Sequence, residues 1–238
     1  MQITLIHQAS AGKGGPDKEA LLQMLREAGH EVFYQSAKDE KWDEALARPT
    51  ELVVAAGGDG TVGRVARRLA GSGTPFTALP LGTANNIARS LGLLHLPLAQ
   101  QPRHWADAQR IHLDIGNAHG PWGEEGFVEG MGLGLFAWMM PMADESEKLA
   151  RITDPEEALA YALRMLRRRL EEHTPEQVQA TLDGEDISGA YLMFEALNLP
   201  YIGPNLYLAP GAKPDDGQFD VVMIDKAHRA ELLEGIID

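Results

Sequence analysis

The sequence contains no cysteine, so neither disulfide bonds nor thiolate metal ligands contribute to its structure. No apolar run approaches the ~18 residues needed to span a bilayer as a helix. The N-terminus, MQITLIHQAS, lacks the basic, apolar and small-residue order of a signal peptide. Repeats and low-complexity segments are also missing. We therefore expect a globular protein in the reducing environment of the cytoplasm.

Acidic residues exceed basic ones, but only in one part of the chain. The net charge is −14, with 10 Lys and Arg against 10 Asp and Glu in residues 1–100, and 11 against 25 in residues 101–238. This asymmetry predicts two structural units. Neither part carries the basic stripe that phosphate backbones require, so nucleic acid is not an expected partner.

The first part of the chain alternates between short apolar strands and amphipathic helices. The expected strands are residues 3–7, 30–35, 51–58 and 76–82, and the expected helices are residues 16–29, 41–48, 61–71 and 83–92. Such alternation with short connections predicts an α/β domain with an open, mostly parallel sheet, which we assign to residues 1–107.

The second part is rich in strand-like segments separated by turn dipeptides. The expected strands are residues 112–118, 125–139, 178–185, 190–198, 205–210 and 219–225. One clear helix at residues 155–173 interrupts them, and residues 226–238 resemble the start of another. We predict a β-rich, sandwich-type domain over residues 108–238 that is incomplete at its C-terminal end.

A glycine-rich loop, GGDGT at residues 57–61, follows the most apolar strand and precedes a helix. Gly57, Gly58 and Gly60 allow a phosphate to approach the backbone amides at the helix N-terminus. Asp59 would repel a phosphate directly, so its expected use is to hold a cation or a water molecule beside it. The alternative is a tight turn with a helix cap at Thr61.

A second loop of this kind lies in PLGTANNIARSLG, at residues 80–92. It turns at Gly82 and offers Thr83, Asn85 and Asn86 at a helix start, where Thr and Asn are also ordinary N-caps. Loops after neighbouring parallel strands meet at one edge of the sheet, where α/β folds bind ligands. The two loops together favour a polyphosphate site.

A third loop, HQASAGKGG, follows the first strand. It is not a Walker A motif, because Lys13 is followed by Gly14 rather than by Ser or Thr. Either a phosphate-contacting turn or a plain flexible turn fits this segment.

The motifs occur in a characteristic order. GGDGT and PLGTANNIARSLG are followed by LDIG at residues 113–116, GFVEGMGLG at 126–134 and LAPGAKPDDGQFDVV at 208–222. In this order the sequence resembles the diacylglycerol kinase catalytic domain, which sphingosine kinases and bacterial soluble lipid kinases share. It is more distantly similar to NAD kinases. The resemblance covers nearly the whole chain.

This resemblance implies a kinase that binds ATP and Mg²⁺ between an α/β domain and a β-sandwich. The implied nucleotide-contacting residues are Ser10, Ala11, Gly12, Ser36, Gly57, Gly58, Asp59, Gly60, Thr61, Thr83 and Asn85. Asp59 and Asp114 would belong to the acidic network around the catalytic Mg²⁺. A structural Mg²⁺ would lie at Lys213, Asp216 and Gln218, where a tight turn with paired acids also suits a hard cation.

The sequence departs from the family pattern at several positions. Gln8 and Ala9 replace the usual Asn-Pro of the first loop, and Asn86 replaces a common Asp. The family's presumed general base lies in a late D-G-E/D motif, whereas this chain ends at Asp238 and its D-G-E at residues 183–185 matches an earlier hairpin turn. We therefore expect this chain to bind MgATP but to turn over poorly.

Two segments are candidates for contact with a lipid acceptor. LGLFAWMMPMA, at residues 133–143, is suited to acyl chains, or else forms a core strand of the sandwich. Arg164, Arg167, Arg168 and Arg169 are either a solvated helix face or a site of peripheral contact with anionic headgroups. A homodimer is also compatible with the sequence.

The function expected from the sequence is ATP-dependent phosphorylation of a lipid hydroxyl, with a diacylglycerol-like or sphingoid acceptor. Two alternatives remain open at this point. One is a nucleotide kinase similar to NAD kinases, and the other is a non-catalytic nucleotide-binding module.

Overall fold

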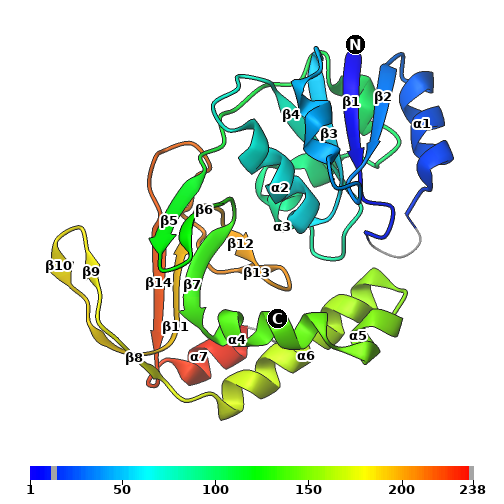
Figure 1. Cartoon of the computed structure of the whole chain (residues 1–238). Helices are drawn as coiled ribbons and strands as arrows, with labels where there is room; N and C mark the ends of the chain where they lie inside the picture. The colour runs from blue at the N-terminus through cyan, green and yellow to red at the C-terminus, as the bar shows by residue number, and fades with distance from the viewer. Residues whose placement is uncertain (12–14, 236–238) are drawn as a thin grey trace.

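A computed structural model describes residues 1–11 and 15–235 of the chain, and it contains two units (Figure 1). The first unit is built on a parallel sheet with the strand order β2-β1-β3-β4. Its strands are β1 (Gln2–His7), β2 (Glu31–Ser36), β3 (Leu52–Gly57) and β4 (Phe76–Pro80). The predicted open parallel α/β sheet is confirmed.

Helices cover both faces of this sheet, as the alternation of periods predicts. They are α1 (Lys18–Glu27), α2 (Asp59–Leu69), α3 (Asn86–Ser90) and the 3₁₀ helices η1 (Trp42–Ala47), η2 (Leu93–His95) and η3 (Gln101–His104). Leu21 and Leu25 of α1 pack against one face, and Val62 and Val65 of α2 pack against the other. All six residues of β3 are buried, since this strand lies between the two layers.

The strand order creates a switch point between β1 and β3. The chain moves outward from β1 to β2 on one side, and then to β3 and β4 on the other. Loops that leave β1 and β3 therefore diverge at the carboxyl edge of the sheet, which is where open α/β sheets form ligand sites.

The second unit contains a four-stranded antiparallel sheet and several two-stranded ribbons. Strand β11 (Gly189–Leu197) pairs with β7 (Gly130–Gly134), β8 (Glu176–Val178) and β14 (Asp220–Asp225). The ribbons are β5 (Gly116–Gly120) with β6 (Gly123–Phe127), β9 (Thr181–Leu182) with β10 (Glu185–Asp186), and β12 (Tyr201–Ile202) with β13 (Leu206–Tyr207). The β-rich second domain is thus confirmed as a fold class.

Three consecutive helices interrupt these strands, where the sequence predicts only one. They are α4 (Leu135–Asp144), α5 (Glu147–Arg151) and α6 (Pro155–Glu172). Figure 1 shows them below the sheet of the second unit, reaching beneath the carboxyl edge of the first sheet. The predicted helix at 155–173 is confirmed.

The strand predicted for residues 125–139 is wrong in its second half. Strand β7 ends at Gly134, and residues from Leu135 onward are helical. The run LFAWMM contains no β-branched residue, and a short continuous apolar run does not distinguish a buried strand from a buried helix by its period. Gly134, with φ of 85°, makes the change of direction between the two elements.

Two smaller differences concern the start of one strand and the type of one helix. The strand predicted from residue 112 begins only at Gly116, because the backbone of Asp114 bonds to Pro214 and Asn198 instead of to a ladder. The helix predicted at 41–48 is a 3₁₀ helix that buries Trp42 and Ala45 against the first sheet.

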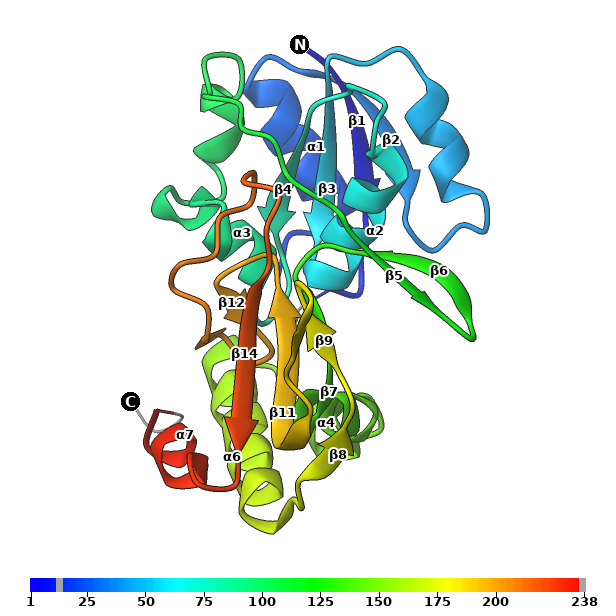
Figure 2. The ribbon, with the colours of Figure 1, turned by 90° about the vertical axis from the view of Figure 1, so that its left-hand side faces the viewer.

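Apolar side chains also join the two units. Val128 and Leu199 of the second unit belong to the same buried cluster as Val62 and Ile87 of the first. Figure 2, a view turned by 90°, shows β11 and β14 continuing downward from the region below the first sheet. The boundary predicted between residues 107 and 108 stays a prediction.

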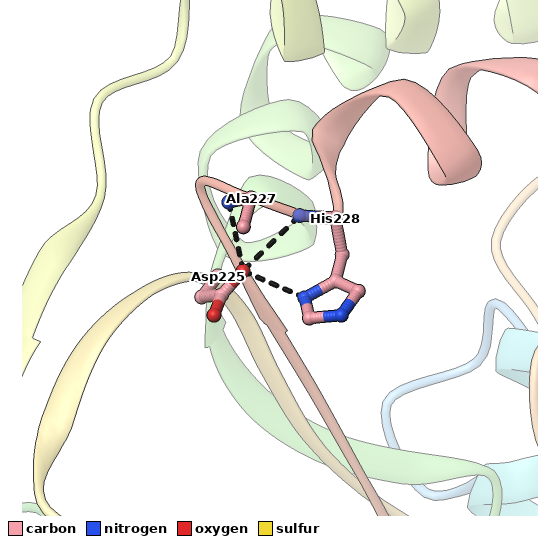
Figure 3. Close-up of polar contacts among 3 residues, drawn as sticks. All are labelled: Asp225, Ala227 and His228. Atoms are coloured by element: carbon pink, nitrogen blue, oxygen red, sulfur yellow. Dashed lines mark hydrogen bonds and ion pairs between the residues drawn. The ribbon is translucent and has the colours of Figure 1, made fainter.

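The last described helix, α7 (Arg229–Gly235), follows β14 through a hydrogen-bonded turn. The Asp225 carboxylate accepts hydrogen bonds from the backbone N–H groups of Ala227 and His228, at 2.8 and 3.1 Å, and lies 2.7 Å from Nδ1 of His228 (Figure 3). Among the described residues, no helix is both long and apolar enough to cross a membrane.

Candidate functional site

The two glycine loops predicted from the sequence lie against each other. A Cβ placed on Gly82 would be only 2.5 Å from Cα of Gly58, so the loop after β4 touches the loop after β3 through backbone alone. The N–H of Leu81 also donates to the carbonyl oxygen of Gly57, at 2.9 Å. Glycine is therefore required at residue 82, and a Cβ on Gly58, 3.2 Å from Cα of Gly82, would also be a tight fit.

The GGDGT loop leads into the first turn of α2. Gly57 ends β3, Gly58 is the N-cap, and Asp59, Gly60 and Thr61 are helical. A Cβ on Gly57 would lie 2.6 Å from Oγ1 of Thr61, whereas one on Gly60 would meet no atom within 4 Å. The exposed backbone at Gly60 thus offers open space at the positive end of the helix dipole.

Asp59 links the two loops electrostatically. Its Oδ1 accepts a hydrogen bond from the backbone N–H of Ile87, at 2.9 Å, and so caps the start of α3. Burial raises the pKa of Asp59, and hydrogen bonds from backbone amides, with Ile87 first, oppose this rise. An acid from one loop therefore holds the helix that follows the other.

Glu129 joins this cluster, although the sequence analysis gave it no role. Burial, together with the nearby Asp59 carboxylate, raises the pKa of Glu129 to about 8. The side chain of Asn86 lies between them and donates to the carbonyl oxygen of Gly203, at 2.8 Å. Glu129 lies in the quoted segment GFVEGMGLG, so an acid within a glycine-rich hairpin was the signal available in the sequence.

Two buried oxygens of this cluster have no partner within the described part of the chain. They are Oδ1 of Asn86 and Oε1 of Glu129. Together with the Asp59 carboxylate they form a set of hard oxygen donors, which is the ligand type that Mg²⁺ prefers. The residues present therefore fit a divalent cation at this position.

The remaining predicted residues of the second loop have different surroundings. Asn85 has left-handed backbone conformation, and its side chain accepts from N–H of Gly82, at 2.9 Å, and donates to the Gly82 carbonyl, at 2.8 Å. Both of its polar groups thus brace the loop. Thr83 is exposed and lines the pocket described below.

The loop after β1 reaches the same edge of the sheet. Ser10 is exposed, accepts a hydrogen bond from the Gln8 side chain at 3.0 Å, and lines the same pocket as Thr83. The N–H of Ala11 donates to the Gln8 carbonyl at 2.9 Å, and Gly12 lies outside the described residues. Ser36 ends β2, where its hydroxyl accepts from N–H of Lys38 at 3.2 Å.

Among the described residues, no hydrogen bond joins Asp114 to Asp59. Asp114 lies instead at the turn around residue 216. Its Oδ2 accepts from N–H of Gly217, at 2.8 Å, and its own N–H donates to the Pro214 carbonyl, at 2.7 Å. In the same turn Asp216 accepts from N–H of Gln218, at 3.1 Å. The structure thus places Asp114 against the turn that carries the residues assigned to the structural Mg²⁺.

This turn is better suited to a cation that keeps part of its water shell than to one surrounded by protein ligands. Lys213, Asp216 and Gln218 are all exposed. Within residues 1–11 and 15–235, no cluster of three or more acidic or His side chains is arranged to hold a metal. Backbone carbonyls and water, with one or two carboxylates, are the donors that such a turn provides.

A pocket of about 420 Å³ opens where the first sheet's carboxyl edge faces the helices of the second unit. Ser10, Thr83 and Ala84 form one wall. The other walls are mostly apolar and come from α4, α5, α6 and the β12–β13 turn. They consist of Met139, Met140, Ala143, Leu149, Ile152, Thr153, Asp154, Pro155, Ala158, Leu159, Ala162, Gly203 and Pro204. The pocket therefore joins hydroxyl groups of the loops to an apolar interior.

A parallel α/β unit with paired glycine loops, joined to a β-rich unit, defines the fold class of this chain. Solved structures agree with this fold: a diacylglycerol kinase from Bacillus anthracis superimposes with a TM-score of 0.71 at 22% identity, covering 99% of this chain and 77% of that one.

Sequence comparisons identify the family. The profile of the diacylglycerol kinase catalytic domain matches residues 2–118, and that of the YegS C-terminal NAD kinase beta sandwich-like domain matches residues 142–237. A Pseudomonas aeruginosa protein named "Probable lipid kinase YegS-like" is 31% identical over 93% of this chain and 71% of its own length. The Bacillus subtilis diacylglycerol kinase is 28% identical over 90% of this chain and 69% of its own. The chain belongs to the diacylglycerol kinase family, and the predicted resemblance is confirmed.

Proposed function

We propose that this chain is an ATP-dependent lipid kinase that transfers the γ-phosphate of MgATP to a lipid hydroxyl. The observation that carries the proposal is the pocket that connects Ser10 and Thr83 of the loops to the apolar surfaces of α4, α5 and α6. A phosphate donor needs the polar end of such a site, and an acyl-bearing acceptor needs the apolar end.

The nucleotide phosphates would lie along the backbone of the two glycine loops. The N–H groups at the start of α2 and the exposed hydroxyl of Thr83 supply donors there. Close contact between Gly58 and Gly82 keeps the two loops in fixed relative positions, so the phosphates meet a preformed surface.

The cluster of Asp59, Asn86 and Glu129 would hold the catalytic Mg²⁺, which supplies charge neutralisation at the transferring phosphoryl group. The raised pKa of Glu129 reflects its burial first and the nearby Asp59 carboxylate second. Asn86 in place of an acid leaves this site with one negative charge fewer, and the carboxyl group of Glu129 would supply a further oxygen donor. The 213–218 turn, held by Asp114, would carry the structural Mg²⁺.

In the transfer step, the acceptor hydroxyl oxygen forms a bond to the γ-phosphorus while the bond from that phosphorus to the β–γ bridging oxygen breaks. ADP departs, and the hydroxyl proton passes to a carboxylate base. We do not assign this role to Asp59, because its carboxylate already caps α3.

The test combines binding with product analysis. Calorimetric titration of MgATP into the chain is expected to show one site, and γ-labelled ATP is expected to label a short-chain diacylglycerol slowly, in keeping with the poor turnover expected from the sequence. Labelling of NAD and not of lipid would favour the NAD-kinase alternative. MgATP binding without any phosphoryl transfer would favour the non-catalytic module, and no binding by a folded chain would contradict the proposal.

A further inference from the structure

The outward face of α4 has no charged side chain before Asp144. Between Leu135 and Ala143 the helix reads LFAWMMPMA. Its inward residues, Leu135, Phe136 and Met139, belong to the buried core of the second unit. Its outward residues, which we call the α4 apolar face, are Ala137, Trp138, Met140, Pro141 and Met142.

Three large side chains on this face are strongly exposed. Trp138 is 54%, Met140 63% and Met142 50% accessible to solvent. A surface helix ordinarily carries polar residues opposite its buried stripe, whereas this one is apolar all round. Trp138 and Met142, four positions apart, are neighbours on the helix, and the exposed Ala137 and Pro141 lie between this pair and Met140. An apolar surface of this extent indicates a surface that is covered in function.

The face is continuous with the pocket. Met140 lies both on the exposed face and in the pocket wall, next to Met139 and Ala143 on the inner side of the same helix. A molecule that slides along α4 from its outer face thus reaches the apolar interior without crossing a polar barrier on this helix.

One cationic side chain adjoins the face, and two others lie on α5 and α6. The Arg169 guanidinium lies 5.5 Å from the centre of the Trp138 ring, and Nε1 of Trp138 donates to Glu176 at 2.7 Å. Arg164 and Lys148 flank the Tyr161 ring, at 5.8 and 4.9 Å from its centre. Trp beside Arg is a combination found where proteins meet the headgroup layer of a bilayer.

We propose that the α4 apolar face inserts into the surface of a lipid bilayer and lets the acceptor enter the pocket along α4. This inference rests on the proposed lipid kinase function for the identity of the entering molecule. A second copy of the chain fits less well, because two molecules with a net charge of −14 repel each other. The same charge predicts that insertion of apolar groups, rather than attraction to anionic lipid, dominates the binding.

The test measures co-flotation of the full chain with phosphatidylcholine vesicles, with and without phosphatidylglycerol. Met142→Gln and Met142→Glu are expected to lower the fraction bound, the latter by at least tenfold. Met142 is chosen because it is exposed and lies outside the pocket wall. Trp122→Gln is the matched control, since Trp122 is 64% exposed on the distant β5–β6 turn. Its vesicle binding is expected to equal that of the parent chain.

Phosphorylation of a monomeric short-chain diacylglycerol separates this inference from the proposed function. Met142→Gln is expected to leave that activity unchanged while vesicle binding falls. Two results would overturn the bilayer assignment even if the kinase is active. One is vesicle binding that is the same for the Met142 variants and the parent chain. The other is a dimer, seen by sedimentation velocity, that Met142→Glu dissociates. If no lipid is phosphorylated but binding still depends on Met142, the proposed function fails and the docking surface stands.

Discussion

Oδ1 of Asp59 accepts a hydrogen bond from the backbone N–H of Ile87, at 2.9 Å, so the acid of the first glycine loop fixes the helix that follows the second. The residue thus has a structural use that the sequence did not suggest, besides the proposed use at the cation. The two uses can be separated, because only the second needs a negative charge.

Asp59→Asn is expected to keep the fold and to weaken MgATP binding by at least tenfold. The amide oxygen of Asn still accepts from Ile87, and loss of the charge relieves the repulsion with Glu129 that accompanies the raised pKa values. Asp59→Ala removes the acceptor as well, and should cost about 0.5–2 kcal/mol of stability. Thermal melting with calorimetry distinguishes the variants; equal MgATP affinity of Asp59→Asn and the parent would limit Asp59 to its structural use.

Substitutions in the glycine loops should separate packing from ligand binding. Gly82→Ala places a Cβ 2.5 Å from Cα of Gly58, and the backbone must shift at a cost of ~1–3 kcal/mol. Gly60→Ala meets no atom and lies in the first turn of α2, where Ala should stabilise by about 0.5–1 kcal/mol.

The informative result is the MgATP affinity of Gly60→Ala. If phosphate approaches the α2 N-terminus, the added methyl group crowds the ligand, and affinity falls although the melting temperature rises. Affinity that rises or stays constant with the melting temperature would place the phosphates elsewhere.

Glu195, at the centre of β11, should make the protein less stable as the pH rises. Burial raises its pKa from 4.5 to about 8, and its carboxylate lies over Gly132 of the neighbouring strand. Below pH 4.5 the side chain is protonated in both folded and unfolded states. Between pH 4.5 and 8 only the unfolded chain ionises, so stability falls by up to roughly 1.4 kcal/mol per pH unit.

Glu195→Gln is expected to flatten this part of the pH profile. Urea unfolding at pH 5 should give similar stabilities for variant and parent, whereas at pH 8 the variant should be clearly more stable. The exposed Glu185→Gln is the control and should follow the parent at both pH values. A parent whose stability is equal at pH 5 and pH 8 would refute the expectation.

The turn before α7 provides a second titration test. A hydrogen bond and the charge of Asp225 raise the pKa of His228, and the bond to His228 lowers the pKa of Asp225 (Figure 3). The stabilisation from His228 is complete below its unfolded pKa of 6.5 and is lost as the pH rises through the folded value. That from Asp225 is present above 3.8 and is lost as the pH falls.

Proton NMR of the His228 ring measures this interaction directly. Asp225→Asn should lower the His228 pKa toward its ordinary value, and Asp220→Asn, at the other end of β14, should leave it unchanged. A His228 titration that is insensitive to Asp225 would show that the pair does not form in solution.

The sequence by itself determined the first unit and the family. The regular exchange of apolar strands and amphipathic helices indicates a parallel sheet, because continuous apolar strands need both faces covered and each helix supplies one apolar stripe to cover them. GGDGT and PLGTAN follow adjacent strands, and parallel strands bring such loops to one edge. The sequence therefore predicts Gly58 as a site residue and Gly82 as the turn of the second loop, and the structure brings the two into contact.

Tertiary structure decided the rest, because it depends on contacts between distant residues. An apolar run such as LFAWMM satisfies strand and helix equally, and packing against Leu166 and Leu170 of α6 makes it a helix. Asp114 joins Gly217, 103 positions away, rather than Asp59. Glu129 acquires its raised pKa only when β7 and α3 bring it beside Asp59 and Asn86, and no local pattern encodes that proximity.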